Sequence, residues 1–306
     1  MTPRVSVVIP SRDRAEVLDG CLAALAAQDA PSDDYEIIVV DNGSTDDTPA
    51  TVACWRDAMP NLRGEHEPCA GVSRARTTGI DLAAGDIVAL LDDDTRPVPG
   101  WLRAVVAGFE HRPGVDAVCG PIVLAWPGPR PRWLTARFEV WYSVQDFGTT
   151  PRLLDATELP WAANVAVRRT RARDLGGFAE ELDRSGTNLV SGGDVDFFAR
   201  LHQAGGTVAY EPDAAVAHAI PASRVSRRWV IRRGYGQGIT DLLMEQRTDP
   251  APGRGALVRR AGRALGRGTV RGWRGTAGLV WRAQQLGYAC RALVLARTYA
   301  RPPSPR

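Results

Sequence analysis

The sequence contains no lysine, and all 38 of its basic residues are arginine. Its five cysteines are odd in number, scattered and never arranged as a CxxC pair. This pattern argues against a disulfide framework and against a zinc site, and it fits a protein of the reducing cytosol. No apolar run approaches the roughly 20 residues of a membrane span, and the N-terminal segment lacks the apolar core of a signal peptide. We therefore expect a cytoplasmic protein.

Charge is unevenly distributed along the 306 residues. Residues 1–220 carry 20 Arg and 32 acidic residues, a net charge of −12. Residues 221–306 carry 18 Arg and three acidic residues, a net charge of +15. An acidic body followed by a basic tail indicates two parts with different roles. We predict one domain over 1–220 and a mainly helical, Arg-rich extension over 221–306, whose last residues, RPPSPR, we expect to be disordered.

Apolar segments alternate with helical patterns in the first third of the chain. The segments that read as strands are VSVVIP (5–10), YEIIVVDNGSTDDT (35–48, running into a turn) and DIVALLDDD (86–94). Between the first two, AEVLDGCLAALAAQ (15–28) has apolar residues at helical spacing. Such apolar strands separated by helices are typical of a parallel sheet covered on both faces. Ser44 or Thr45 would cap the helix that follows the second strand.

Each of the three strands ends in polar or special residues. The endings are Pro10-Ser11-Arg12, Asp41-Asn42-Gly43 and Asp92-Asp93-Asp94. In open parallel sheets, ligands bind beyond the carboxyl ends of the strands, so we expect one site there. Three adjacent carboxylates repel one another, and a divalent cation shared with substrate phosphates would offset this repulsion. A solvated acidic loop is the alternative interpretation of the triplet.

Seven segments of this sequence also occur in an order that resembles one enzyme family. They are VSVVIPSRDR, YEIIVVDNGSTDDT, GVSRARTTGI, GDIVALLDDDTRPVPGWL, WAANVAVRRTRARDLGGFAEEL, GGDVDFFARLHQAGG and YEPDAAVAH. Over about residues 4–218 the chain resembles the inverting family-2 glycosyltransferases of the GT-A fold. The resemblance implies an α/β fold with a Rossmann-like, mostly parallel sheet flanked by helices. It also implies a nucleotide-binding half over about 1–117 and an acceptor-binding half over about 118–220.

On the donor side, the resemblance implies a role for five residues at the first strand ends and in GVSRARTTGI. Asp41 would accept a hydrogen bond from the nucleobase of a sugar nucleotide, and Pro10 and Arg12 would line the same pocket. Arg74 and Arg76 would help to hold the base or the diphosphate. These assignments make a nucleoside-diphosphate sugar the expected donor, with UDP as the first candidate and dTDP and GDP as alternatives.

The resemblance divides the acidic triplet into separate roles. Asp92 and Asp94 match the outer aspartates of the DxD motif: Asp92 would contact the ribose, and Asp94 would ligate Mn²⁺ or Mg²⁺. Asp93 occupies the variable middle position and would only support the donor site. His218, at the end of YEPDAAVAH, would provide a further metal or phosphate contact, and a purely structural histidine is the alternative.

On the acceptor side, Asp194 of SGGDVDFF aligns with the general base of the family, which takes the proton of the acceptor hydroxyl. Gly193 stands where the family usually has Glu, and Asp196 is a much weaker candidate for the base. A helix N-cap is the alternative role for Asp194, and both roles are compatible. Trp161 and Asn164 would shape the sugar and acceptor pocket, with a core position as the alternative for Trp161.

The tail contains a second pattern that is independent of this site. GLVWRAQQLGYACRALVLARTYA (278–300) places Leu279, Leu286 and Leu293 at helical intervals, and residues 250–306 contain 12 Arg and no acid. A basic amphipathic helix indicates an anionic membrane surface or an acidic partner. Packing on the acidic body is the alternative. We expect either a cytoplasmic protein or one peripheral at the inner face of the membrane, and no nucleic-acid partner.

Together these features predict a metal-dependent, inverting glycosyltransferase that moves a sugar from a nucleoside-diphosphate sugar, with UDP as the first candidate, to a hydroxyl acceptor. The acceptor could be a cell-surface glycan, a lipid-linked glycan or a natural product. A sugar nucleotidyltransferase is one alternative, but it would need a glycine-rich loop after the first strand, and IPSRDRAEVL has no glycine. A catalytically weakened sugar-nucleotide-binding or scaffold protein is the other, and Gly193 is the residue that favours it.

Overall fold

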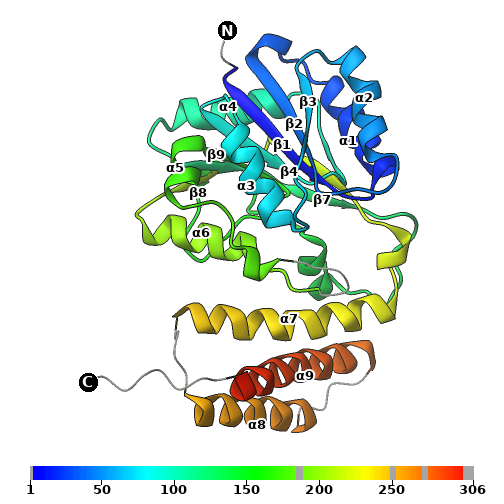
Figure 1. Ribbon diagram of the computed structural model, residues 1–306, viewed down its shortest axis with the longest axis vertical. Coiled ribbons are helices and arrows are strands. Elements are labelled where there is room, and N and C mark those ends of the chain that lie inside the picture. Colours follow the sequence, from blue (N-terminus) through cyan, green and yellow to red (C-terminus); the bar gives the residue numbers. More distant parts are fainter. Residues whose placement is uncertain (1–2, 184–188, 249–252, 271–274, 299–306) are drawn as a thin grey trace. The chain divides into compact units, whose positions relative to one another are not determined.

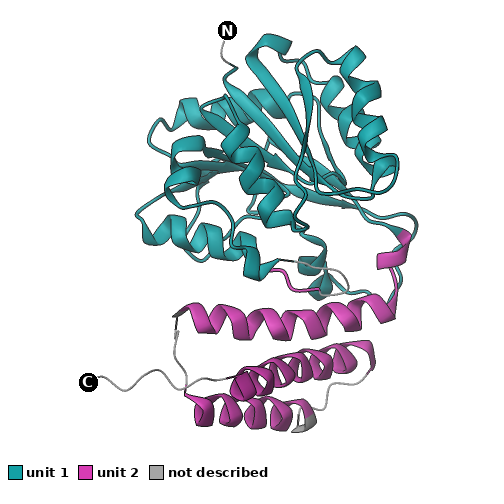
Figure 2. Ribbon diagram, in the orientation of Figure 1, with its two compact units in different colours: residues 1–183, 193–221 teal, residues 184–192, 222–306 magenta. Residues whose placement is uncertain are grey.

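The computed structural model describes residues 3–183, 189–248, 253–270 and 275–298. The predicted disordered end, RPPSPR, lies outside these residues. The chain divides into two compact units (Figure 2). The first, here called the sheet unit, comprises residues 1–183 and 193–221, and the second, the helical unit, comprises residues 184–192 and 222–306.

The sheet unit contains an eight-stranded, mostly parallel sheet (Figure 1). In spatial order its strands are β3 (Leu62–His66), β2 (Tyr35–Asp41), β1 (Val5–Ser11), β4 (Ile87–Leu91), β9 (Asn164–Arg168), β6 (Ala117–Cys119), β10 (Val208–Tyr210) and β8 (Arg152–Leu153). The first four strands run parallel to one another. Strand β9 is antiparallel to both β4 and β6, and β8 is antiparallel to β10. The predicted mostly parallel sheet is therefore confirmed.

A smaller sheet completes the strands of this unit. Its spatial order is β5 (Thr95–Pro97), β11 (Val216–Ala219) and β7 (Ile122–Ala125). Strand β11 pairs antiparallel with β5, so that His218 lies opposite Thr95. The backbone N–H of Ala219 also donates to the carbonyl oxygen of Asp94 at 2.8 Å. This pairing brings a strand from late in the chain beside the acidic triplet.

Helices cover both faces of the large sheet. They are α1 (Ala15–Ala26), α2 (Thr48–Ala58), α3 (Val72–Leu82), α4 (Trp101–His111), α5 (Arg169–Asp174) and α6 (Gly193–Gln203). Shorter 3₁₀ turns are η1 (Ser32–Asp34), η2 (Ala136–Tyr142), η3 (Glu180–Leu182) and, in the helical unit, η4 (Ala222–Arg224). Because side chains alternate along a strand, Val7 packs in one core with α1, α2 and α4, whereas Val8 packs in a second core with α3, α5 and α6.

The start of α2 differs from the prediction. The helix begins at Thr48 with Asp47 at the N-cap position, so a cap at Ser44 or Thr45 is wrong. The Ser44 Oγ instead accepts a hydrogen bond from the backbone N–H of Asp13 at 3.0 Å. The serine therefore connects the loops after β1 and β2. The residues next to Ser44 in the sequence do not indicate this contact, because its partner comes from another loop.

The helical unit consists of α7 (Arg227–Thr248), α8 (Arg254–Val270) and α9 (Gly275–Thr298). Helix α9 packs against both of the others, and its buried positions are mainly glycine and alanine. A Cβ added at Gly287 would lie 2.0 Å from the carbonyl oxygen of Tyr235, so glycine is required where α9 meets α7. Among the described helices, none has both the length and the apolar character that crossing a membrane requires.

Candidate functional site

The carboxyl ends of β1, β2 and β4 meet at one edge of the large sheet. Ser11, which ends β1, is in register with Asp41, which ends β2. Strand β4 runs parallel to β1 and passes directly into Asp92. The three predicted strand ends therefore lie at the same edge, where ligands of such sheets bind.

Cationic side chains of the chain itself contact the acidic triplet. Arg14 donates from Nη2 to the Oδ2 of Asp94 at 2.7 Å, and its Nη1 lies 3.1 Å from the Oδ1 of Asp93. Ser11 donates its hydroxyl to the other oxygen of Asp93 at 2.8 Å. Asp92 accepts a hydrogen bond from Arg76 at 2.7 Å. Every carboxylate of the triplet is thus paired, which offsets most of the repulsion expected between adjacent charges.

Asp94 and His218 form a buried pair, each with 3% of its side chain exposed. The His218 Nε2 lies 3.1 Å from the Oδ1 of Asp94. Its Nδ1 lies 2.7 Å from the carbonyl oxygen of Tyr142, which can only accept, so Nδ1 carries a proton. The imidazole is therefore held with Nε2 facing the carboxylate. This is the arrangement in which a backbone carbonyl orients a metal-binding histidine.

Burial and neighbouring charge shift the pKa values of these groups. For Asp93, burial is the main cause and raises the pKa, Arg14 opposes it, and Asp94 adds to it. For His218, burial alone would lower the pKa, but the hydrogen bond and charge of Asp94 outweigh it and the net shift is upward. The edge of the sheet therefore favours positive charge near Asp94.

Arg76 bridges two carboxylates from distant parts of the chain. Its Nη2 donates to Asp92 at 2.7 Å and its Nη1 donates to the Oδ1 of Asp194 at 2.8 Å. Burial disfavours its charge, but Asp194 and Asp92 outweigh that effect and raise the pKa of Arg76. The guanidinium lies 5.5 Å from the ring centroid of Phe178, which supports it from one face.

Two glycines allow the helices that carry this bridge to approach their neighbours. A Cβ at Gly79 would lie 2.2 Å from a methyl group of Val8, so glycine lets α3 pack closely on β1. A Cβ at Gly193 would lie 3.1 Å from the Oγ of Ser73. The glycine that replaces the Glu of the family pattern therefore sits at a tight contact between α6 and α3.

Asp194 lies in the first turn of α6, with 21% of its side chain exposed. Besides the contact with Arg76, its Oδ2 accepts a hydrogen bond from the backbone N–H of Ala162 at 3.2 Å. Because α6 begins at Gly193, Asp194 lies inside the first turn and does not occupy the N-cap position. Its carboxylate is oriented by the contacts with Arg76 and Ala162 instead. Asp196 is buried instead, and it pairs with Arg200 at 2.8 Å.

The remaining donor-side candidates make no contact with the acidic triplet or with Arg76 among the interactions described here. Asp41 accepts a hydrogen bond from the backbone N–H of Ser44 at 3.0 Å, and Pro10 is buried in β1. Arg12 is half exposed, and its Nε lies 3.7 Å from the Oδ2 of its neighbour Asp13. Arg74 pairs with Glu180 at 2.6 Å. Their nucleotide-binding roles stay predictions.

The two acceptor-side candidates differ in their surroundings. Trp161 is partly buried, packs against the core, and donates from its indole N–H to the carbonyl oxygen of Val144 at 3.1 Å. Asn164 is buried and accepts a hydrogen bond from the Trp101 indole at 2.9 Å. Its amide group donates to the carbonyl oxygens of Pro121 and Ala214. Both amide protons are used internally, so we leave Asn164 out of the acceptor site proposed below.

Sequence reasoning missed the role of Arg14. The sequence contains two arginines after β1, in SRDR, and only the first, Arg12, was assigned a role. The structure places the second one on the triplet because the backbone turns at Asp13, whose φ is +51°. The only sequence signal was the alternation of charges in this short segment.

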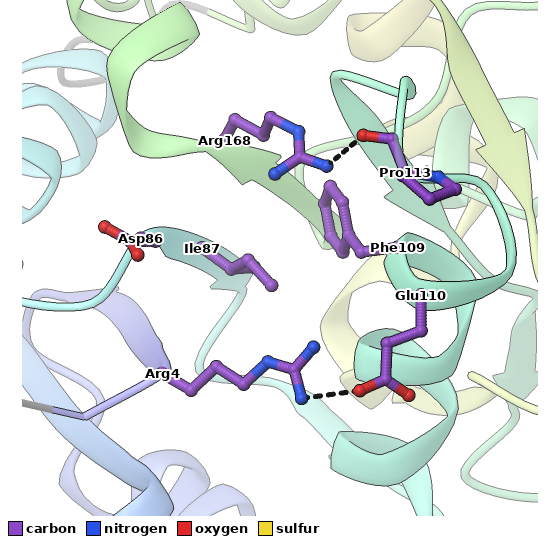
Figure 3. Close-up of a pocket in the computed structure, with 7 residues that line it drawn as sticks. All are labelled: Arg4, Asp86, Ile87, Phe109, Glu110, Pro113 and Arg168. Carbon is purple, nitrogen blue, oxygen red and sulfur yellow. Dashed lines mark hydrogen bonds and ion pairs between the residues drawn. The ribbon is translucent and has the colours of Figure 1, made fainter.

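A cavity in the sheet unit lies away from the acidic triplet and the Arg76 bridge. It has a volume of about 450 Å³ and is lined by Arg4, Asp86, Ile87, Phe109, Glu110, Pro113 and Arg168 (Figure 3). Arg4 and Asp86 immediately precede β1 and β4, so the cavity lies toward the amino ends of these strands. Its two arginines are engaged by Glu110 and by the carbonyl oxygen of Pro113. None of the predicted site residues lines it.

The donor atoms at Asp94 and His218 fit a divalent cation that is shared with a ligand. Two neighbouring ligands on an octahedral ion with bonds of about 2.1 Å are roughly 3 Å apart, and Oδ1 and Nε2 are separated by 3.1 Å. Within the described residues, no set of three or more His, Cys, Asp or Glu side chains could hold a metal ion. Asp94 and His218 together could supply two ligands, and the remaining positions of such an ion could be filled by phosphate oxygens and water.

The chain is similar to glycosyltransferases of known sequence. A family model described as glycosyl transferase family 2 matches residues 6–176. The succinoglycan biosynthesis protein ExoM of Rhizobium meliloti is 32% identical over 232 residues, which cover 74% of this chain and 71% of that protein.

Solved structures show a related fold. The mannosyltransferase PcManGT from Pyrobaculum calidifontis, in complex with GDP-Man and Mn²⁺, has a TM-score of 0.59 at 22% identity, covering 99% of this chain and 77% of that one. Residues 1–349 of S. aureus TarS, in complex with UDP-GlcNAc, have a TM-score of 0.57 at 17% identity, covering 96% and 92%. These similarities confirm the predicted GT-A type fold.

Proposed function

The chain belongs to glycosyl transferase family 2, and from that premise we propose that it transfers a sugar from a nucleoside diphosphate to a hydroxyl group with inversion at the anomeric carbon. The observation that carries the proposal is the Asp92–Arg76–Asp194 bridge. It joins the carboxylate assigned to the donor ribose with the carboxylate assigned to the acceptor. Donor and acceptor would meet where these side chains meet.

On the donor side, Asp92 would accept hydrogen bonds from the ribose hydroxyls. Asp41, with Pro10 and Arg12, would form the base pocket at the ends of β1 and β2. Arg74 would approach the diphosphate from α3, after exchanging its exposed partner Glu180 for phosphate oxygens. Such exposed ion pairs are weak, so this exchange costs little.

Asp194 would act as the general base. A sugar hydroxyl is a poor nucleophile near neutral pH, and a positioned carboxylate can take its proton as the new bond forms. The partial exposure of Asp194 leaves it accessible to an acceptor, whereas Asp196 is buried against Arg200. The proton leaves the acceptor oxygen for Asp194 while that oxygen attacks the anomeric carbon and the nucleoside diphosphate departs.

Asp94 and His218 would hold Mn²⁺ or Mg²⁺ together with the diphosphate of the donor. When bound, the cation would supply Lewis-acid stabilisation of the charge on the departing diphosphate. The protein contributes a fixed imidazole orientation through Tyr142 and a carboxylate that already faces it. Two protein ligands plus substrate phosphates is a common way of binding such ions.

We propose UDP as the nucleotide and a glycan as the acceptor. TarS in complex with UDP-GlcNAc supports a UDP donor on this fold, and PcManGT in complex with GDP-Man makes GDP the alternative to test. The relative named for succinoglycan biosynthesis supports a cell-surface glycan or its lipid-linked precursor as the acceptor. The partly buried Trp161 would offer an apolar ring surface to that sugar.

A thermal-shift screen with UDP, GDP and dTDP, each with Mn²⁺, Mg²⁺ or EDTA, tests the donor assignment. Stabilisation grows with the ratio of ligand concentration to Kd, so the correct nucleotide should raise the melting temperature most, and only with a cation present. UDP-sugars should then be hydrolysed or transferred with release of UDP. Equal shifts with all nucleotides, or none with any, would contradict the proposal.

Replacing Arg76 tests whether the bridge positions both carboxylates. In Arg76→Lys the charge is kept, but one ammonium group cannot hold Asp92 and Asp194 in the same fixed geometry. We expect kcat to fall about 10- to 100-fold, since small misplacements of catalytic groups have effects of this size. The KM for the acceptor should change much less.

Arg63→Lys is the matched control for this measurement. Arg63 also contacts two carboxylates, Glu36 and Glu65, but it lies on β3, away from the proposed site. Its replacement should leave kcat within about twofold of the parent. If Arg76→Lys retained full kcat, the bridge would have no positioning role.

A further inference from the structure

The outward face of α9 is apolar and basic. Leu279, Leu286 and Leu293 are exposed by 49%, 47% and 39%. At about 100° per residue, these leucines and the exposed Arg282 and Arg297 fall within about 60° around the helix axis. The leucines extend over roughly 21 Å at about 1.5 Å per residue. An ordinary amphipathic helix of a folded unit would bury them.

The helix packs inward through its small residues instead. Its buried positions include Gly278, Gly287, Ala289, Ala292 and Ala296, which allow close contact with its neighbouring helices. The predicted leucine spacing is present, but the prediction of an amphipathic helix is wrong: apolar side chains lie both on the packing face of α9 and on its exposed face. Clustered exposed apolar side chains, unlike single ones, mark a surface that binds something.

Helix α8 also exposes apolar and basic side chains. Val258 and Leu265, seven residues apart, are exposed by 48% and 45%. Arg259, Arg263 and Arg267 are exposed on the same helix, about 100° to 180° around its axis from Val258. Residues 222–306 have 18 Arg and three acidic residues, and none of the acidic residues lies on α8 or α9. The occupant of this surface should therefore be apolar and anionic.

We propose that the outward leucines and arginines of α8 and α9 bind an anionic lipid surface. Leucines would enter the interface between headgroups and acyl chains, and the arginines would contact the anionic headgroups. This binding differs from spanning, for which no described helix is suited. It does not depend on which donor or acceptor the enzyme uses.

A second copy of the chain fits this surface less well. Leucines seven residues apart can pair between helices, but Arg282 and Arg297 lie on the same stripe and would face like charges in a parallel symmetric pair. Stable helix pairs of this type normally place opposite charges beside the apolar seam. Neither α8 nor α9 contains an acidic residue that could do so.

Co-sedimentation of the full chain with vesicles tests the proposal. We expect binding to vesicles of phosphatidylglycerol and phosphatidylcholine, little binding to phosphatidylcholine alone, and weaker binding at high salt. The variant L279Q/L286Q/L293Q should bind the anionic vesicles at least about tenfold more weakly. R282Q/R297Q should lose most of the preference for anionic over neutral vesicles, and it provides a second test if the leucine variant folds poorly.

The variant L82Q/V123Q/L153Q is the control, since it removes three exposed apolar side chains from the sheet unit. It should bind vesicles like the parent chain. Absent binding by the parent, or unchanged binding by both the leucine and the arginine variants, would overturn the proposal. Sedimentation velocity tests the alternative occupant, a second copy of the chain. If the parent did not bind lipid but formed a dimer that the leucine variant lost, the lipid proposal would also be overturned.

Discussion

Asp194→Asn should lower kcat for sugar transfer by about 10²- to 10⁴-fold, the usual contribution of a general base. The substitution keeps the shape of the side chain but removes the group that takes the proton of the acceptor. Initial rates of UDP release with saturating acceptor measure the effect. Donor binding, followed by thermal shift with the nucleotide and Mn²⁺, should be nearly unchanged, because the proposed donor contacts lie on Asp92 and Asp94.

Asp196→Asn is the matched control for this substitution. Asp196 lies two residues further along α6, is buried, and pairs with Arg200 rather than facing the bridge. Its replacement can lower stability, since a buried charge pair loses one partner, but the folded enzyme should keep most of its kcat. If the two variants lost activity equally, or if Asp194→Asn kept full turnover, Asp194 would not be the base.

The strand ends were predictable because their signals are local. Apolar runs that give way to Pro10, Asp41 and Asp92 locate the strand ends to within one residue, and parallel pairing then brings those ends to one edge. The same reasoning predicted a parallel sheet covered on both faces, and the family resemblance implied its GT-A type. The antiparallel insertion of β9 between β4 and β6 was not predicted, because strand direction depends on pairing and not on apolar pattern.

The contacts within the site were harder to predict because they join distant residues. Arg76 and Asp194 are separated by 118 positions, and they meet only because α3 and α6 lie on the same face of the sheet. Arg14 reaches the triplet through a backbone turn at Asp13. A bound cation was expected to offset the repulsion among the aspartates, but Arg14, Ser11 and Arg76 already contact the three carboxylates.

Replacing Asp94, the proposed metal ligand, should weaken the effect of the cation on nucleotide affinity. In Asp94→Asn the carboxylate that faces His218 becomes a neutral amide, which is a weaker ligand for Mn²⁺ or Mg²⁺. We expect the gain in UDP affinity on adding Mn²⁺ to fall at least about tenfold, measured by calorimetry with and without the ion. Transfer should fall by about 10²-fold or more, since charge on the departing diphosphate would lose its main stabilisation.

Asp93→Asn makes this result interpretable, because it applies the same change to the adjacent residue. Both carboxylates are buried and both contact Arg14, so the two variants make the same change from carboxyl to amide at nearly the same place. Only Asp94 faces the Nε2 of His218. If the cation is held there, Asp93→Asn should keep most of the Mn²⁺-dependent gain in UDP affinity. An equal loss in both variants would mean that the triplet acts through its total charge, and the assignment of Asp94 as a ligand would be wrong.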